Sequence, residues 1–131
     1  MPPVLIHTTF SLNNSHQMRK IEREMNAAIR DCRDWKSGNT EVCTMNDGVS
    51  YVYLHGNKIA EIGDDFVTIF DGGCQSATTK SRLNAILQAN AIKGECVIQR
   101  NFKWFVHKFI GQAGTSPVYN EYEFSNGFIF A

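Results

Sequence analysis

The N-terminal third of the chain carries hydrophobic residues at helical spacing. Between residues 15 and 35 they recur every three or four positions, which places them on one face of a helix. The members of this face are Met18, Ile21, Met25, Ala28, Ile29, Cys32 and Trp35. Ser15 or Asn14 is suited to cap such a helix, and Gly38 to end it. We therefore predict a long N-terminal helix over residues 15–35, preceded by a strand.

Alternating apolar and polar positions then predict strands. Residues 41–45 and 49–54 flank an Asn-Asp-Gly turn, and residues 58–62 and 66–70 flank a Gly-Asp-Asp turn. Short turns of this kind join neighbouring antiparallel strands. The pattern therefore predicts an antiparallel β meander.

The second half begins with another helical segment. Gly72 and Gly73 precede a helix predicted over residues 79–91, and residues 96–100 and 102–109 are predicted to form a further strand pair or one bent strand. The aromatic tail after these strands is expected to dock on the body or on a partner subunit. This order of elements indicates an α+β fold, in a single domain covering the whole chain.

Composition and charge narrow the function classes. The 131 residues include 13 basic and 13 acidic side chains, so no global field draws the chain to nucleic acid or to an anionic membrane. No apolar run approaches the roughly 18 residues of a membrane span, and the N-terminus lacks a signal-peptide pattern. The four cysteines show no zinc-ligand spacing and are expected to be reduced. We expect a cytoplasmic protein without metal or cofactor.

The start of the second helix is a candidate anion site. Thr78 and Thr79 offer an N-cap, and Lys80, Ser81 and Arg82 occupy the first turn. Helix N-termini present unpaired N–H groups and a partial positive charge, which favour phosphate. The alternative is an ordinary capped helix that binds nothing. The spacing is not that of a Walker motif, so nucleotide hydrolysis is not indicated.

A second basic feature lies on the polar side of the N-terminal helix. Steps of three and four residues align four arginines, with Asn26 between them, into an arginine ridge: Arg19, Arg23, Arg30 and Arg33. Neighbouring acidic residues, among them Glu22 and Asp31, favour a solvated face of ion pairs. If the helix instead packs against a copy of itself, the ridge lines a cleft between subunits and can grip phosphate.

Three segments resemble a known family. The segment L-H-G-N-K-I-A (residues 54–60), the Gly72-Gly73 pair and the segment T-T-K-S-R-L-N-A-I-L (residues 78–87) are similar to the first-described Thoeris anti-defence family of phage proteins. The resemblance implies a non-enzymatic sponge that binds glycocyclic ADP-ribose. Some members also bind cyclic oligonucleotides of CBASS defence at a separate site. It further implies a homo-oligomer, a dimer or a trimer of dimers, without nucleic acid or membrane as partner.

The resemblance also implies site residues. It places the signal pocket at Gly73, Cys74, Thr79, Arg82 and Asn84. Family members carry an aromatic residue after the two glycines, where this chain has Cys74, so base stacking falls to Phe66, to Trp104 or to no residue. For a second ligand site we expect Arg19, Arg23 and Arg100, with arginines of several subunits converging.

Two other functions stay open at this point. One is binding of single-stranded nucleic acid by the arginine ridge and by Phe102, Trp104 and Phe105. The other is a small phosphoesterase, in which His55 or His107 acts as acid or base at the same anion site. No cysteine can be placed beside a histidine from the sequence, so a catalytic cysteine is not expected.

Overall fold

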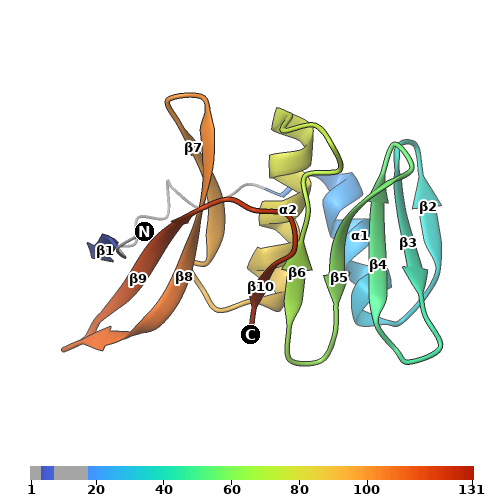
Figure 1. Cartoon of the computed structure of the whole chain (residues 1–131). Coiled ribbons are helices and arrows are strands. Elements are labelled where there is room, and N and C mark those ends of the chain that lie inside the picture. The colour runs from blue at the N-terminus through green and yellow to red at the C-terminus, as the bar shows by residue number, and fades with distance from the viewer. Residues whose placement is uncertain (1–3, 8–17) are drawn as a thin grey trace.

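The computed structural model describes residues 4–7 and 18–131 (Figure 1). Within these residues the chain forms two helices and two antiparallel sheets, which confirms the α+β class. Figure 1 shows helix α2 between the smaller sheet and the larger one. Among the described residues, neither helix has the length and apolar character needed to cross a membrane.

The larger sheet is the predicted meander with one strand added at each edge. Its order is β10-β6-β5-β4-β3-β2. The strands are β2 (Trp35–Ser37), β3 (Thr40–Thr44), β4 (Ser50–Leu54), β5 (Asn57–Ile62), β6 (Val67–Ile69) and β10 (Phe128–Phe130). Phe128 pairs with Ile69 on β6, so the aromatic tail docks on the body of its own chain.

The smaller sheet contains the predicted N-terminal strand and the predicted strand pair. Its order is β1-β9-β8-β7. The strands are β1 (Val4–His7), β7 (Cys96–Arg100), β8 (Lys103–Ala113) and β9 (Ser116–Glu123). One face of this sheet, with Val97, Trp104 and Val106, joins the main hydrophobic core.

The predicted N-terminal helix is present over only part of the predicted range, and its predicted C-terminal end at residue 35 was wrong. Helix α1 spans Lys20–Arg30, and its C-cap is Asp31. Cys32 adopts a left-handed backbone with φ of 51°, which ends the helical path, and Trp35 instead pairs with Val42 across two strands. The positions of the predicted helix before residue 18 lie outside the described residues.

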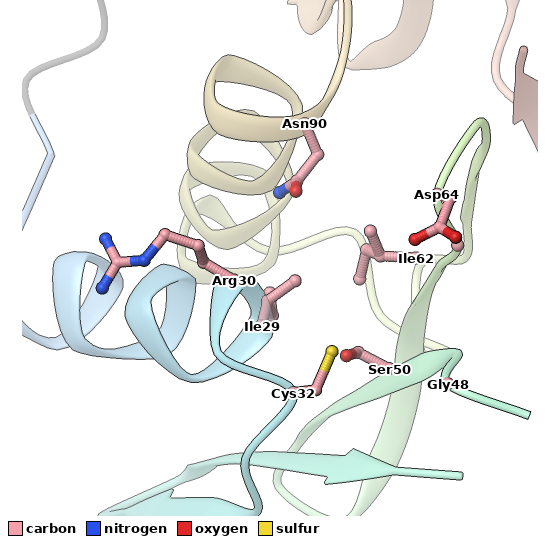
Figure 2. A pocket seen from close by; sticks show the side chains of 9 residues that line it. Ile29, Arg30, Cys32, Gly48, Ser50, Ile62, Asp64 and Asn90 are labelled. Carbon is pink, nitrogen blue, oxygen red and sulfur yellow. The ribbon is translucent and has the colours of Figure 1, made fainter. Parts of the chain in front are cut away.

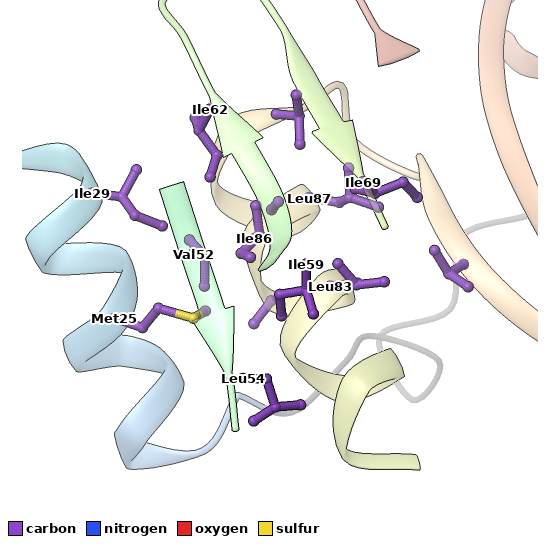
Figure 3. Close-up of a cluster of buried hydrophobic side chains, with 14 of the residues drawn as sticks. Met25, Ile29, Val52, Leu54, Ile59, Ile62, Ile69, Leu83, Ile86 and Leu87 are labelled. Carbon is purple, nitrogen blue, oxygen red and sulfur yellow. The ribbon is translucent and has the colours of Figure 1, made fainter. Parts of the chain in front are cut away.

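The apolar face of α1 is covered within the chain. It packs on α2 and on β3, and Met25 and Ile29 join the core that Figure 3 shows. The physical reason for expecting α1 to pair with a second copy is therefore absent. Oligomerisation itself stays a prediction.

Helix α2 (Ala77–Asn90) is the centre of the core. Leu83, Ile86 and Leu87 are fully buried against β5, β6 and β7 (Figure 3). A helix enclosed by two sheets needs hydrophobic residues on more than one face. Its N-terminus lies at the sheet end that carries the β4–β5 turn, and its C-terminus lies at the opposite end (Figure 1).

Candidate functional site

The N-terminus of α2 is capped by Ser76. The predicted caps, Thr78 and Thr79, fall inside the helix instead. The Thr79 N–H donates to Ser76 Oγ at 3.1 Å, and the Thr79 hydroxyl donates to the Cys74 carbonyl at 3.3 Å. The two hydroxyls of Ser76 and Thr79 also lie 2.8 Å apart. Thr79 is therefore buried and holds the turn that leads into the helix.

The loop before this helix depends on its glycines. Gly72 and Gly73 both have left-handed backbones, with φ of 69° and 88°. A Cβ on Gly72 would lie 3.1 Å from Ile59 Cγ2, so this position also allows the loop to approach β5 closely. The Gly73 N–H donates to Asp71 Oδ1 at 2.8 Å, and Cys74 follows with an exposed side chain.

A pocket of about 290 Å³ lies between this loop and the β4–β5 turn. We call it the α2 N-terminal pocket. Its lining residues are Leu54, His55, Asn57, Ile59, Asp71, Gly72, Cys74, Ser76, Thr78 and Thr79. The meander explains the arrangement, because alternate connections of antiparallel strands lie at the same end of a sheet. Of the predicted signal-pocket residues, Cys74 and Thr79 line this pocket, and Gly73 lies in its loop.

Arg82 lies elsewhere, in a buried polar network. Its side chain is 4% exposed, and its Nη1 donates to Glu22 Oε2 at 2.8 Å. Its Nε donates to Thr40 Oγ1 at 3.0 Å, and Ser81 Oγ donates to the same Glu22 oxygen at 2.6 Å. These bonds join α2 to α1 and β3. The assignment of Arg82 to a ligand stays a prediction, and its guanidinium is bonded inside the protein.

Asn84 is also engaged by the protein itself. Its Nδ2 donates to the Val97 carbonyl at 2.9 Å, and its Oδ1 accepts the Val97 N–H at 2.8 Å. This pair of bonds fixes β7 to α2. Asn84 does not line the α2 N-terminal pocket, and its ligand role likewise stays a prediction.

The three arginines predicted for a second site lie on two separate elements. Arg19 is the exposed N-cap of α1, and the exposed Arg23 donates to the Met18 carbonyl at 2.9 Å. Arg100 lies on β7 of the smaller sheet, where it forms an ion pair with Glu121 and covers the Phe105 ring. No contact joins Arg100 to the other two arginines in the described part of one chain. Their convergence across subunits stays a prediction.

The predicted aromatic stacking residues do not reach the pocket. Trp104 is buried and packs edge-to-face on Phe124, with ring centroids 5.3 Å apart. Phe66 lies against Gly63, at the far end of β5. His55, by contrast, has a ring side chain that lines the pocket. Its backbone is left-handed, with φ of 51°. Sequence analysis offered either His55 or His107 for this anion site, and the β4–β5 turn places His55, not His107, in the lining of the pocket.

The outward face of the smaller sheet brings a cysteine and a histidine together. Cys96 Sγ lies 3.9 Å from His107 Nδ1, and His107 Nε2 lies 3.0 Å from Glu121 Oε1. Burial, and secondly the charge of Glu95, raises the pKa of Cys96 to about 11. The thiol therefore stays protonated near neutral pH, which disfavours nucleophilic chemistry. Nor do the described residues include any group of three or more His, Cys, Asp or Glu arranged for a metal ion.

A second pocket, of about 200 Å³, lies at the opposite end of the larger sheet (Figure 2). We call it the helix C-terminal pocket, because both helices end beside it. It is lined by Ile29, Arg30, Cys32, Gly48, Ser50, Ile62, Gly63, Asp64 and Asn90. Figure 2 shows the Cys32 sulfur and the Ser50 hydroxyl directed toward each other, whereas the Arg30 side chain extends away.

Comparison with known proteins places the chain in a family. Searches of curated proteins and of solved structures give no match. A model of the Kyanoviridae Gp96 protein family matches residues 18–131, which is most of the chain. The chain is therefore a phage protein and belongs to the Kyanoviridae Gp96 protein family.

Proposed function

We propose that this phage protein binds a cyclic nucleotide immune signal in the α2 N-terminal pocket and sequesters it without cleaving it. The observation that carries the proposal is the convergence of two sequence segments. Residues 54–60 and residues 72–79 are separated in the chain, and side chains from both line one pocket. These segments carry the resemblance to the Thoeris anti-defence sponges, for which the signal is glycocyclic ADP-ribose.

The chemistry of the pocket suits a phosphate group and a ribose. The N–H groups of Ala77 and Thr78 precede the hydrogen-bond ladder of α2, and the helix dipole favours an anion beside them. The Thr78 hydroxyl adds a donor. The Asp71 carboxylate, which also lines the pocket, can accept ribose hydroxyls, so the diphosphate of the ligand would lie on the helix-start side, away from Asp71. His55 offers a flat ring beside a base in place of the aromatic residue that Cys74 replaces.

The size of the pocket and the expected affinity fit a small ligand. About 290 Å³ is near the lower end of the range for small-molecule sites. A sponge acts by mass action and must hold its ligand below the threshold of the effector. A dissociation constant near 10 nM corresponds to about 11 kcal/mol of binding free energy. Such a protein would act in the cytoplasm of the infected host cell.

On the basis of the resemblance, we also propose that the chain forms a homo-oligomer with a second ligand site. Cyclic oligonucleotides would bind where Arg19, Arg23 and Arg100 of several subunits meet. Arg19 and Arg23 are exposed, as such a site requires, and Arg100 is partly exposed beside Glu121.

Isothermal titration of the full chain with glycocyclic ADP-ribose tests the primary site. We expect tight binding, and heating the complex should release unchanged ligand. Cys74→Trp should tighten binding, because an aromatic ring at this exposed position can stack on a base. Gln75→Trp is the matched control, since Gln75 is an exposed neighbour outside the pocket lining. Absence of binding, or equal effects of both tryptophans, would contradict the proposed site.

A phosphoesterase is the second candidate, because His55 lines the same pocket. In that case the titrated ligand would be recovered as a cleaved product, and His55→Ala would abolish cleavage while leaving the ligand bound. Recovery of intact ligand from the unmodified chain supports the sponge instead.

A further inference from the structure

The turn between β7 and β8 has an unfavourable backbone for its residues. Arg100 pairs with Lys103, so Asn101 and Phe102 alone form the turn, with φ of 52° and 65°. Two-residue turns with both φ values positive favour Asn-Gly. A phenylalanine in the left-handed region is a steric outlier, because its Cβ crowds the backbone. The folded chain therefore gains nothing in backbone energy from Phe102.

Phe102 also makes no compensating contact. Its side chain is 95% exposed, at the tip of a hairpin that Figure 1 shows projecting beside α2. Strain combined with exposure of a large apolar side chain indicates a role outside the folded monomer. Aromatic side chains of this kind are typical anchors of protein interfaces.

The helix C-terminal pocket has the size to receive this ring, and two isoleucines lie in a lining that is otherwise largely polar. Its volume is about 200 Å³, and a cavity of about 150 Å³ already admits benzene. Ile29 and Ile62 supply apolar walls. Ser50 is 1% exposed, and Figure 2 shows its hydroxyl directed toward the Cys32 sulfur at the pocket. An aromatic face can accept such a donor.

A cation lies beside the ring, and three carboxylates lie at the pocket, where the lining residue Arg30 is paired with Asp31. Asp64 lines the pocket, Asp65 follows it, and Asp47 precedes the pocket residue Gly48. All three aspartates are exposed. Beside Phe102, Lys103 is exposed and forms no ion pair within the described residues. Attraction between Lys103 and these carboxylates would orient the docking.

The hairpin tip and the pocket lie at opposite ends of the molecule (Figure 1). One chain therefore cannot place its own Phe102 in its own pocket. We propose that Phe102 of one chain inserts into the helix C-terminal pocket of a second copy. Such a head-to-tail contact uses two different surfaces of each subunit, and it generates a closed ring or a filament. The contact is independent of the proposed nucleotide pocket at the other end of α2.

Sedimentation velocity over a range of protein concentrations tests this contact. The full chain should associate beyond the monomer. Phe102→Gly should keep it monomeric and also raise its melting temperature, because glycine suits the left-handed backbone. Ile110→Ser is the matched control, since Ile110 is another exposed apolar residue and should leave association unchanged. A chain that stays monomeric at all concentrations would overturn the proposal.

A charge exchange tests the orientation of the two surfaces. Lys103→Asp and Asp64→Lys should each weaken association at least tenfold, and the double variant should recover most of the loss. Association that is indifferent to all three variants would show that copies meet elsewhere. If Phe102 instead proves necessary for binding single-stranded nucleic acid by a monomer, the proposed partner is wrong.

Cysteine labelling locates the occupied pocket. Cys32 lines the helix C-terminal pocket, whereas Cys74 lines the pocket at the other end. Alkylation of Cys32 by iodoacetamide should slow as protein concentration rises, and alkylation of Cys74 should not. The Phe102→Gly variant should lose this protection. Equal labelling of Cys32 at all concentrations in a chain that does associate would reject this pocket as the receptor.

Discussion

Glu22 and Arg82 form an ion pair that the protein encloses almost completely. Glu22 is fully buried and lies on the same face of α1 as Met25 and Ile29. Sequence analysis assigned it to the solvated side, as a partner for surface arginines. Its spacing of three and seven residues from Met25 and Ile29 already placed it on the apolar face. A charge at such a position indicates a buried partner, and α2 supplies it.

Replacing Arg82 should therefore cost much more than replacing a surface arginine. Arg82→Met leaves the buried Glu22 carboxylate without the guanidinium, and we expect the free energy of unfolding to fall by about 3–5 kcal/mol. Arg30→Met is the comparison, because the Arg30 side chain and its partner Asp31 are both exposed, and its loss should change the stability little. Urea unfolding measures both. Similar losses for the two variants would contradict the buried network.

Glu121 should make the stability depend on pH in the acid range. Hydrogen bonds from Arg100 and then from His107 lower the pKa of this carboxyl in the folded chain, although burial opposes them. A lowered folded pKa means that its contribution is present above the unfolded pKa and is lost as pH falls. Melting temperatures should therefore fall less steeply in acid for Glu121→Gln than for the unmodified chain. Parallel curves would contradict this role.

At the scale of elements, strands were easier to predict than helix ends. The turns at Asn-Asp-Gly and Gly-Asp-Asp have strong local signals, and the strands beside them were confirmed. The end of α1 depends on Cys32, whose left-handed backbone has no signal in its residue type. Trp35 continued the helical spacing, yet a cross-strand partner, Val42, holds it in β2. Tertiary pairing overrode local periodicity there.

The cap of α2 gives a test at this scale. Ser76→Ala should lower the free energy of unfolding by about 1 kcal/mol, because the Thr79 N–H loses its acceptor. Ser76→Gly should lower the free energy of unfolding by only about a few tenths of a kcal/mol. Thr78→Ala is the control, since sequence analysis offered Thr78 as the cap. Chemical denaturation in which Thr78→Ala is the costlier change would return the cap to Thr78.

The attachment of β7 to α2 gives a second test. Asn84→Leu removes both bonds to the Val97 backbone, and an unsatisfied buried peptide group costs about 1–3 kcal/mol. The Val97 amide should then exchange its hydrogen much faster in native-state hydrogen exchange, whereas amides of β4 should change little. Unchanged protection of Val97 would show that strand pairing alone holds β7.

At the scale of the whole molecule, we propose different roles for the two ends of the larger sheet. One end carries the α2 N-terminal pocket, which we assign to a nucleotide, and the other carries the pocket that we assign to a second copy. The local sequence predicted an anion site at the first end, from Gly72, Gly73 and the start of α2. It offered His55 and His107 for that end without deciding between them, and it could not bring Cys96, His107 and Glu121 onto one face, because these contacts depend on how distant strands pair.

The most direct measurement is an NMR titration of the isotope-labelled full chain with glycocyclic ADP-ribose. Amide shifts report each residue separately, so they locate a ligand as well as detect it. The account predicts the largest shifts at Gly73, Cys74 and Thr78, with His55 responding from the facing turn. A spectrum without shifts, or with shifts concentrated around Cys32 and Gly48 at the opposite end, would contradict the nucleotide site.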